Sequence, residues 1–129
     1  RTARRKEDRA RGGATAYSIA ARKGASIAGV PLNDREQERL GRAIHWALGI
    51  GAGATYAVLR RRVASVGRTA GLAFGSGFWL LLDEVAVPAL GLTPGPQAFP
   101  WQTHARGLAG HLSFGAVTDA TLHLLDRVA

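Results

Sequence analysis

Three long apolar stretches, separated by short polar or proline-rich segments, run through most of this chain. They cover residues 43–59, 69–90 and 103–125, and their hydrophobic positions follow helical spacing rather than the two-residue alternation of strands. Even the shortest stretch would span about 25 Å at 1.5 Å per helical residue, just enough for a thin bilayer. The pattern therefore predicts an all-α integral membrane protein with three transmembrane helices.

A basic arm and a short amphipathic helix precede the first apolar stretch. Residues 1–12 are highly charged and are expected to form a flexible or surface-bound arm. Residues 14–28 mix small apolar side chains with cations, a composition better suited to lying on a membrane than to crossing it. The predicted organisation is an arm with an interfacial helix over residues 1–32 and a transmembrane domain over residues 33–129.

Positive charge is concentrated at the front of the chain. Residues 1–42 hold 11 Lys/Arg against 5 Asp/Glu, which accounts for most of the total net charge of +8. A basic chain can bind nucleic acid, but a basic tail beside apolar spans is equally well explained by anionic lipid headgroups. We therefore expect the lipid bilayer as a partner and no nucleic acid. The sequence has no cysteine, which excludes a disulfide framework and thiolate chemistry.

The segments between the apolar stretches predict an orientation. Four arginines crowd the short turn after the first stretch, and such turns face the cytoplasm. The uncharged, proline-rich residues 91–102 would then face outward, with Phe99 and Trp101 at the interface. The basic arm would also lie outside, so we expect either a further span upstream or a contact that holds the arm there. The arginines of this membrane-surface turn are Arg60, Arg61, Arg62 and Arg68.

Ionisable side chains inside the apolar stretches form the candidate functional site. Such groups are costly in lipid, so they are usually paired and turned toward other helices. In the predicted topology several of them lie at a similar depth in the outer half of the membrane. The members of this expected buried polar cluster are His45, Asp83, Glu84, His104 and His111.

Three interpretations of this cluster are open on the sequence alone. A carboxylate that accepts hydrogen bonds from imidazoles would lock the helices together. A histidine and a carboxylate at matched depth would also suit a proton or ion relay. Glycines beside His45 and His111 would leave room for a metal or a tetrapyrrole with an axial histidine, but no ligand spacing is diagnostic and no cofactor is predicted. Asp119 and His123, four residues apart, are expected to form only a local pair.

Glycines recur at four-residue steps within the apolar stretches. They are poor helix formers in water, but in membranes they let helix backbones approach closely. No nucleophile arrangement is evident, and the glycines of GIGAGA follow no strand and precede no Lys-Ser/Thr, so they do not form a nucleotide-binding loop. The glycines expected to mediate helix packing are Gly49, Gly53, Gly71, Gly75, Gly107 and Gly115.

Two segments, GRAIHWALGIGAGATYAVLR and FWLLLDEVAVPALGLTPGPQAFPWQTHARGLAGHLSFGAVTD, are similar to a known family across residues 33–125. The family is that of the YagU-like bacterial inner-membrane proteins, a domain family without assigned biochemistry. The resemblance implies a multi-pass helical protein of the bacterial inner membrane, and it implies no reaction. Its motifs are His45, Gly53 and Tyr56 in the first segment, and Asp83-Glu84, Pro88, Gly91-Leu92, Pro100, His104, His111-Leu112 and Gly115 in the second.

These observations predict a small membrane protein without catalytic activity of its own. Three short spans leave glycine-rich faces to be covered, so the expected partners are subunits of a larger membrane complex or further copies of the chain. Its role is then that of an accessory or structural subunit. The alternative is a membrane protein that handles protons or ions, or binds a metal or tetrapyrrole, through its His/carboxylate cluster.

Overall fold

The computed structural model describes residues 2–128, and every regular element in that range is helical. The all-α prediction is thereby confirmed. The elements are α1 (Thr2–Arg11), α2 (Ala16–Ile27), α3 (Asp34–Arg62), α4 (Ala64–Gly67), α5 (Leu72–Trp79), the π-helical segment η1 (Leu80–Ala86), α6 (Val87–Ala89), the 3-10 turn η2 (Pro96–Ala98) and α7 (Trp101–Val128).

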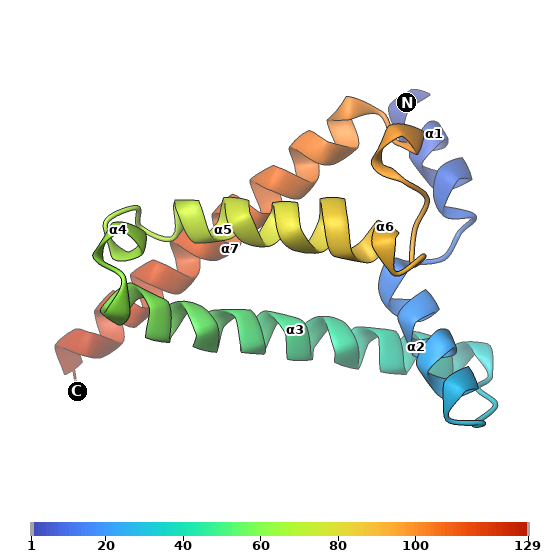
Figure 1. Ribbon diagram of the computed structural model, residues 1–129, viewed down its shortest axis with the longest axis horizontal. Coiled ribbons are helices and arrows are strands. Elements are labelled where there is room, and N and C mark those ends of the chain that lie inside the picture. The colour runs from blue at the N-terminus through green and yellow to red at the C-terminus, as the bar shows by residue number, and fades with distance from the viewer. Residues whose placement is uncertain (1, 129) are drawn as a thin grey trace.

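Three long helical units give the molecule the shape of an open wedge (Figure 1). α3 and α7 meet at the end where α3 stops and α7 reaches the C-terminus, and they diverge toward their other ends. The continuous unit α5–η1–α6 lies between them and packs along α7. α1 and α2 occupy the wide end, opposite the arginine-rich turn that follows α3.

Local sequence chemistry sets the helix starts. α3 begins behind Asn33, whose side chain accepts from the Glu36 N–H at 3.0 Å while the Glu36 carboxylate accepts from the Asn33 N–H at 2.9 Å. The second apolar stretch was expected to be helical from residue 69. Its helix begins three residues later because Ala70 and Gly71 adopt left-handed backbone angles, with φ of 48° and 79°.

One helical stretch among residues 2–128, Leu72–Ala89, is long and apolar enough by itself to cross a membrane. This stretch supports the membrane-protein assignment in its general form. The helices over the first and third apolar stretches do not meet that description within the described chain. Three transmembrane helices therefore stay a prediction.

The basic arm, expected to be flexible or surface-bound, is a helix, α1, docked on the start of α7. Glu7 accepts hydrogen bonds from the Arg106 guanidinium and, at 3.1 Å, from the Thr103 hydroxyl. The Arg11 guanidinium lies over the Phe99 ring, 5.9 Å from its centroid. The arm is held in this way because the acidic Glu7 within the mainly basic residues 1–12 finds a specific cationic partner.

α2 packs against the first turns of α3. A Cβ added at Gly41 would lie only 2.9 Å from the backbone nitrogen of Ser18, which is itself buried. At the other end of α2, Lys23 donates to the Leu90 carbonyl at 3.0 Å. These contacts tie α2 to two parts of the chain. The domain boundary predicted after residue 32 falls between α2 and α3, which pack on each other.

α5 and α7 run antiparallel with their backbones in direct contact. Gly71 faces the backbone of Gly115, and Gly75, one turn further along α5, faces the His111 carbonyl. A Cβ added at Gly71, Gly75 or Gly115 would overlap backbone atoms of the other helix. Only glycine permits an approach this close.

The other three glycines expected to mediate packing behave differently. Gly107 lies against the Trp79 indole, with 3.0 Å between an added Cβ and Nε1. Gly53 makes ordinary contact with the Thr118 methyl group, 3.9 Å from an added Cβ, and Gly49 has open space around it. Close glycine packing therefore joins α5 to α7. The expectation for Gly49 is not met within residues 2–128, because α3 diverges from α7 toward this end.

The described chain buries few apolar side chains. Ala21, Ala52, Tyr56 and Val87 are its buried hydrophobic residues, while eighteen large hydrophobic side chains are exposed, Trp46 among them at 69%. Exposed apolar surface on this scale marks contact with a membrane or with another protein. The wedge therefore needs an apolar environment around it.

We predict that Gly75→Ala destabilises the fold by about 1–3 kcal/mol, the usual cost of overpacking, because α5 and α7 must separate. Thermal unfolding in detergent measures the effect. The matched control is Gly77→Ala, because a Cβ at Gly77 would meet nothing within 4 Å. Equal unfolding temperatures for the two variants would contradict the backbone contact described above.

Candidate functional site

A π-helical segment presents the two acids of the second apolar stretch to α7. Pro88 has no N–H, so the regular helical bond to the Glu84 carbonyl cannot form. The chain widens over Leu80–Ala86 instead, and the Val87 N–H donates to the Leu82 carbonyl five residues back. In this wider turn the neighbouring carboxylates of Asp83 and Glu84 both lie near histidines of α7.

His104 and Glu84 form the closest of these pairs. The His104 Nδ1 lies 2.6 Å from Glu84 Oε1, and its Nε2 lies 3.1 Å from the Pro96 carbonyl oxygen. A carbonyl only accepts hydrogen bonds, and so does an ionised carboxylate. An imidazolium donating from both nitrogens satisfies both contacts. The pair thus holds η1, the proline-rich loop and α7 together.

His111, two turns along α7, is hydrogen-bonded in a different way. Its Nδ1 donates to the Gly107 carbonyl at 3.0 Å, and the nearest oxygen of Asp83 lies 3.8 Å from the same nitrogen. Its Nε2 has no hydrogen bond among the described residues. Since a carbonyl cannot donate, Nδ1 carries the proton, and Nε2 of the neutral ring keeps its lone pair.

His45 stands apart from the acids it was expected to join. It is exposed on α3 and packs edge-on against the Tyr17 ring, with the centroids 4.7 Å apart. Burial and then the nearby Asp83 carboxylate raise the pKa of the Tyr17 phenol above its ordinary value, so it stays a neutral hydroxyl. Among residues 2–128, the expected five-residue cluster is therefore two His–carboxylate pairs, with no hydrogen bond or ion pair joining His45 to either acid, because α3 diverges from α7 at this end.

Two cavities adjoin these residues. A polar cavity of ≈ 370 Å³ lies beneath α1, and its charged lining residues are Glu7, Arg11, Asp83, Glu84, His104 and Arg106. A more apolar cavity of ≈ 640 Å³ lies between α3 and α7, where both His45 and His111 contribute to the wall. The two histidines thus share a cavity although they share no hydrogen bond.

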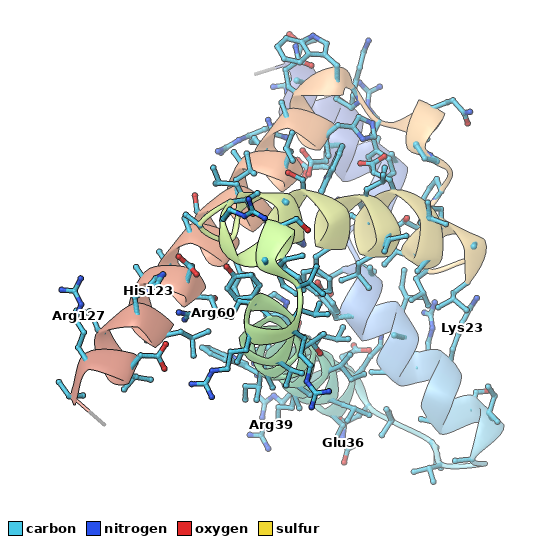
Figure 2. The ribbon with its side chains drawn as sticks, turned by 60° about the vertical axis from the view of Figure 1, so that its left-hand side comes forward. Lys23, Glu36, Arg39, Arg60, His123 and Arg127 are labelled. Atoms are coloured by element: carbon cyan, nitrogen blue, oxygen red, sulfur yellow. The ribbon has the colours of Figure 1, made fainter. Side chains whose placement is uncertain are left out.

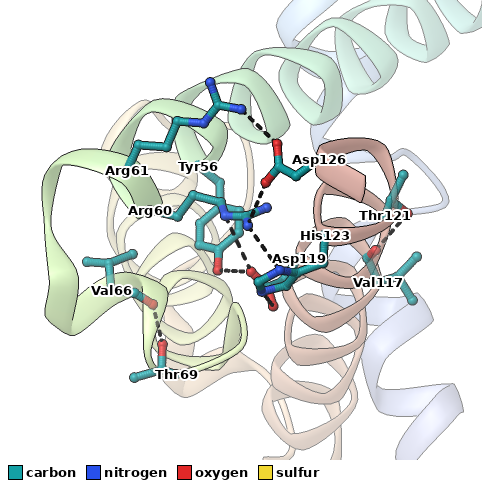
Figure 3. A network of polar contacts seen from close by, with 10 residues as sticks. All are labelled: Tyr56, Arg60, Arg61, Val66, Thr69, Val117, Asp119, Thr121, His123 and Asp126. Atoms are coloured by element: carbon teal, nitrogen blue, oxygen red, sulfur yellow. Dashed lines mark hydrogen bonds and ion pairs between the residues drawn. The ribbon is translucent and has the colours of Figure 1, made fainter. Parts of the chain in front are cut away.

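A second polar network lies at the narrow end of the wedge (Figure 3). Asp119 is 4% exposed and accepts from the Tyr56 hydroxyl at 2.7 Å. The Arg60 Nε lies 3.9 Å from the Asp119 carboxylate, and His123 Nε2 lies 3.5 Å from it. Asp119 is thus the most enclosed acid of the described chain, joined to α3 as well as to its own helix.

Asp126 extends this network toward the surface. It accepts from Arg60 at 3.0 Å and from Arg61 at 2.8 Å. The Arg60 side chain is only 10% exposed, whereas that of Arg61 is 73% exposed. In Figure 2, Arg60 of α3 and His123 of α7 lie close to each other between their two helices, while Arg127 points away from the rest of the molecule.

These contacts correct one expectation from the sequence and add to another. Asp119 and His123 are more than a local helix pair, and Arg60, expected in a membrane-surface turn, also binds acids of α7. Tyr56 and Arg60 share one face of α3 at a spacing of four residues, a pattern that could have revealed the partner of Asp119. The remaining arginines of the turn, Arg61, Arg62 and Arg68, are exposed.

The chain was compared with protein families, curated proteins and solved structures. A family model described as a protein of unknown function (DUF1440) matches residues 17–120, most of the chain. The chain belongs to the DUF1440 family. This confirms the YagU-like resemblance, and the family description assigns no chemistry to the cluster. The comparisons with curated proteins and with solved structures gave no match.

The DUF1440 family description gives no role to these histidines and acids, so their role is inferred from their geometry. Within residues 2–128, no three His, Asp or Glu side chains gather closely enough to hold a metal ion between them. Two ion-paired contacts between helices lie at opposite ends of the wedge, and we call them clasps: the Glu84–His104 pair and the Tyr56–Asp119–Arg60 network. In addition, His111 lies on a cavity, and its Nε2 has no hydrogen bond among the described residues.

We predict that Asp119→Ala destabilises the fold by about 3 kcal/mol, the low end for breaking a buried ion pair, since Arg60 keeps Asp126 as a partner. Asp126→Ala is the matched control on the same helix. Its side chain is 39% exposed, and its loss is expected to cost less than about 1 kcal/mol. Thermal unfolding in detergent separates the two. A smaller loss for Asp119 than for Asp126 would contradict the clasp.

Proposed function

We propose that this DUF1440 protein is a multi-pass protein of the bacterial inner membrane that serves as an accessory or structural subunit, with no catalytic activity of its own. The observation that carries the proposal is the mismatch between four buried apolar residues and eighteen exposed large ones. A lone chain with so small a core gains little from its own packing. Contact with helices of other subunits, or of further copies of the chain, supplies the missing partners.

The proposed architecture has α3, the unit α5–η1–α6 and α7 as three membrane crossings. Its support is the uncharged run over residues 43–59, the apolar stretch Leu72–Ala89, and the pairing of Glu84 and Asp119 with α7 or α3 rather than with lipid. The Arg60–Arg68 turn would face the cytoplasm. α1 and α2 would lie on the outer side, where the Glu7–Arg106 contact supplies the hold that the basic arm requires.

We predict that the turn after α3 and the proline-rich loop lie on opposite sides of the membrane. The chain has no native cysteine, so Ser65→Cys and Gln97→Cys each introduce a single reporter thiol. In intact spheroplasts, a membrane-impermeant maleimide should label the Gln97 variant only, and in inverted vesicles the Ser65 variant only. Labelling of both variants from one side would overturn the three-span architecture.

A second candidate function is proton or ion handling, favoured by the 2.6 Å contact between His104 and Glu84 beside the polar cavity. Glu84→Gln separates the two candidates because it removes the charge and keeps the side-chain shape. For an accessory subunit, we predict that the wild type extracts in mild detergent as an oligomer or a complex, and that Glu84→Gln weakens this assembly.

The same two proteins are reconstituted into vesicles to measure pH-driven flux. A relay predicts intact assembly and lost flux in the variant, whereas a structural role predicts weakened assembly with no flux in either protein. Wild-type protein that forms a stable, monodisperse lone monomer in mild detergent would contradict the proposed subunit role. Size-exclusion chromatography with light scattering measures the assembly state of each protein.

A further inference from the structure

The apolar cavity between α3 and α7 has the character of a ligand site. Its volume of ≈ 640 Å³ lies within the range of about 300–1,000 Å³ usual for cofactor and ligand pockets. Its walls are mainly apolar and aromatic, with few polar groups. The residues that bear on its chemistry are His45, Gly49, Phe78, Arg106, Gly110 and His111.

His111 and His45 both line this cavity, and His111 is the one of the two whose ring is oriented by a hydrogen bond at one nitrogen while the other nitrogen has none among the described residues. Its Nδ1 is held by the Gly107 carbonyl at 3.0 Å, and the Asp83 carboxylate lies 3.8 Å behind the same nitrogen. Metal-ligating histidines almost always donate one ring N–H to a carbonyl or carboxylate, which fixes the tautomer and leaves the other nitrogen free to coordinate. His104 lacks this property because both of its nitrogens already meet acceptors.

The space in front of His111 suits a flat, rigid ring. A Cβ added at Gly49 or Gly110 would meet nothing within 4 Å, so both sides of the cavity lack side chains there. The Phe78 ring meets the His111 ring edge-on, with the centroids 5.3 Å apart, which limits its rotation. Tyr17 and Arg106, whose guanidinium also binds Glu7, line the same cavity and offer hydrogen-bond donors to acidic substituents of a bound ring.

We infer that this cavity binds a metal-centred tetrapyrrole, with His111 Nε2 as an axial ligand. A single axial histidine can hold a tetrapyrrole iron, so no cluster of three ligating side chains is required. The inference extends beyond the proposed subunit role, because it assigns a ligand to a cavity that this role does not explain.

The test titrates hemin into the purified full chain in detergent and follows the visible absorption spectrum. The wild type should saturate at one hemin per chain with a histidine-ligated spectrum, and His111→Gln should lose it. His123→Gln is the matched control, since His123 lies on the same helix outside this cavity and is 58% exposed. A wild-type spectrum equal to that of hemin in detergent alone would overturn the inference, as would an unchanged spectrum in His111→Gln.

A second pair of variants tests the cavity without touching the histidine. Gly49→Leu fills the space in front of His111, whereas Gly51→Leu places the same side chain on the α5-facing side of α3, and neither added Cβ meets a neighbour within 4 Å. The inference expects hemin binding to be lost in Gly49→Leu and kept in Gly51→Leu. Equal retention, or equal loss, in both variants would overturn the assignment to this cavity.

Discussion

The direct backbone contact between α5 and α7 sets the positions of the polar side chains in this fold. Gly71 and Gly75 bring α5 so close to Gly115 and the His111 carbonyl that no other residue would fit at these glycines. The contact fixes the antiparallel register of the two helices. Because η1 continues α5 without a break, the same register sets Glu84 opposite His104 and Asp83 beside Gly107, within 3.8 Å of the His111 Nδ1 one turn further along α7. Glycine packing at one end of the pair thus positions the polar chemistry at the other.

The two clasps at opposite ends of the wedge differ in what they join. The Glu84–His104 pair joins η1 to α7 near the wide end of the wedge. The Tyr56–Asp119–Arg60 network joins α3 to α7 at the narrow end. Between the two clasps α3 has few contacts with α5 and α7, which leaves the cavity lined by His45 and His111. A buried ion pair is weak evidence for added stability, but it fixes which helix meets which. The small apolar core of this protein would fix the arrangement of the helices only loosely, and the two clasps make that arrangement specific.

The two histidines of α7 show how backbone acceptors separate chemically identical side chains. His104 meets an acceptor at both nitrogens, so its protonated form is the one that satisfies its surroundings. His111 meets a carbonyl at one nitrogen, so its neutral form keeps a lone pair for a ligand. Spacing along the helix could place the two on one face, but it could not distinguish their roles.

Helical periodicity, the Asn33–Glu36 capping box and hydropathy are local properties, so the order of residues alone predicts the all-helical class, the position of the long helices and the costly ionisable groups within them. Three features came from the folded arrangement instead: Asp119 is enclosed by Tyr56 and Arg60, Glu7 fastens the basic arm, and His45 packs on Tyr17 without a bond to the acids. The first and the last of these depend on the angle at which α3 diverges from α7. That angle follows from contacts between residues far apart in the chain, which no local pattern records.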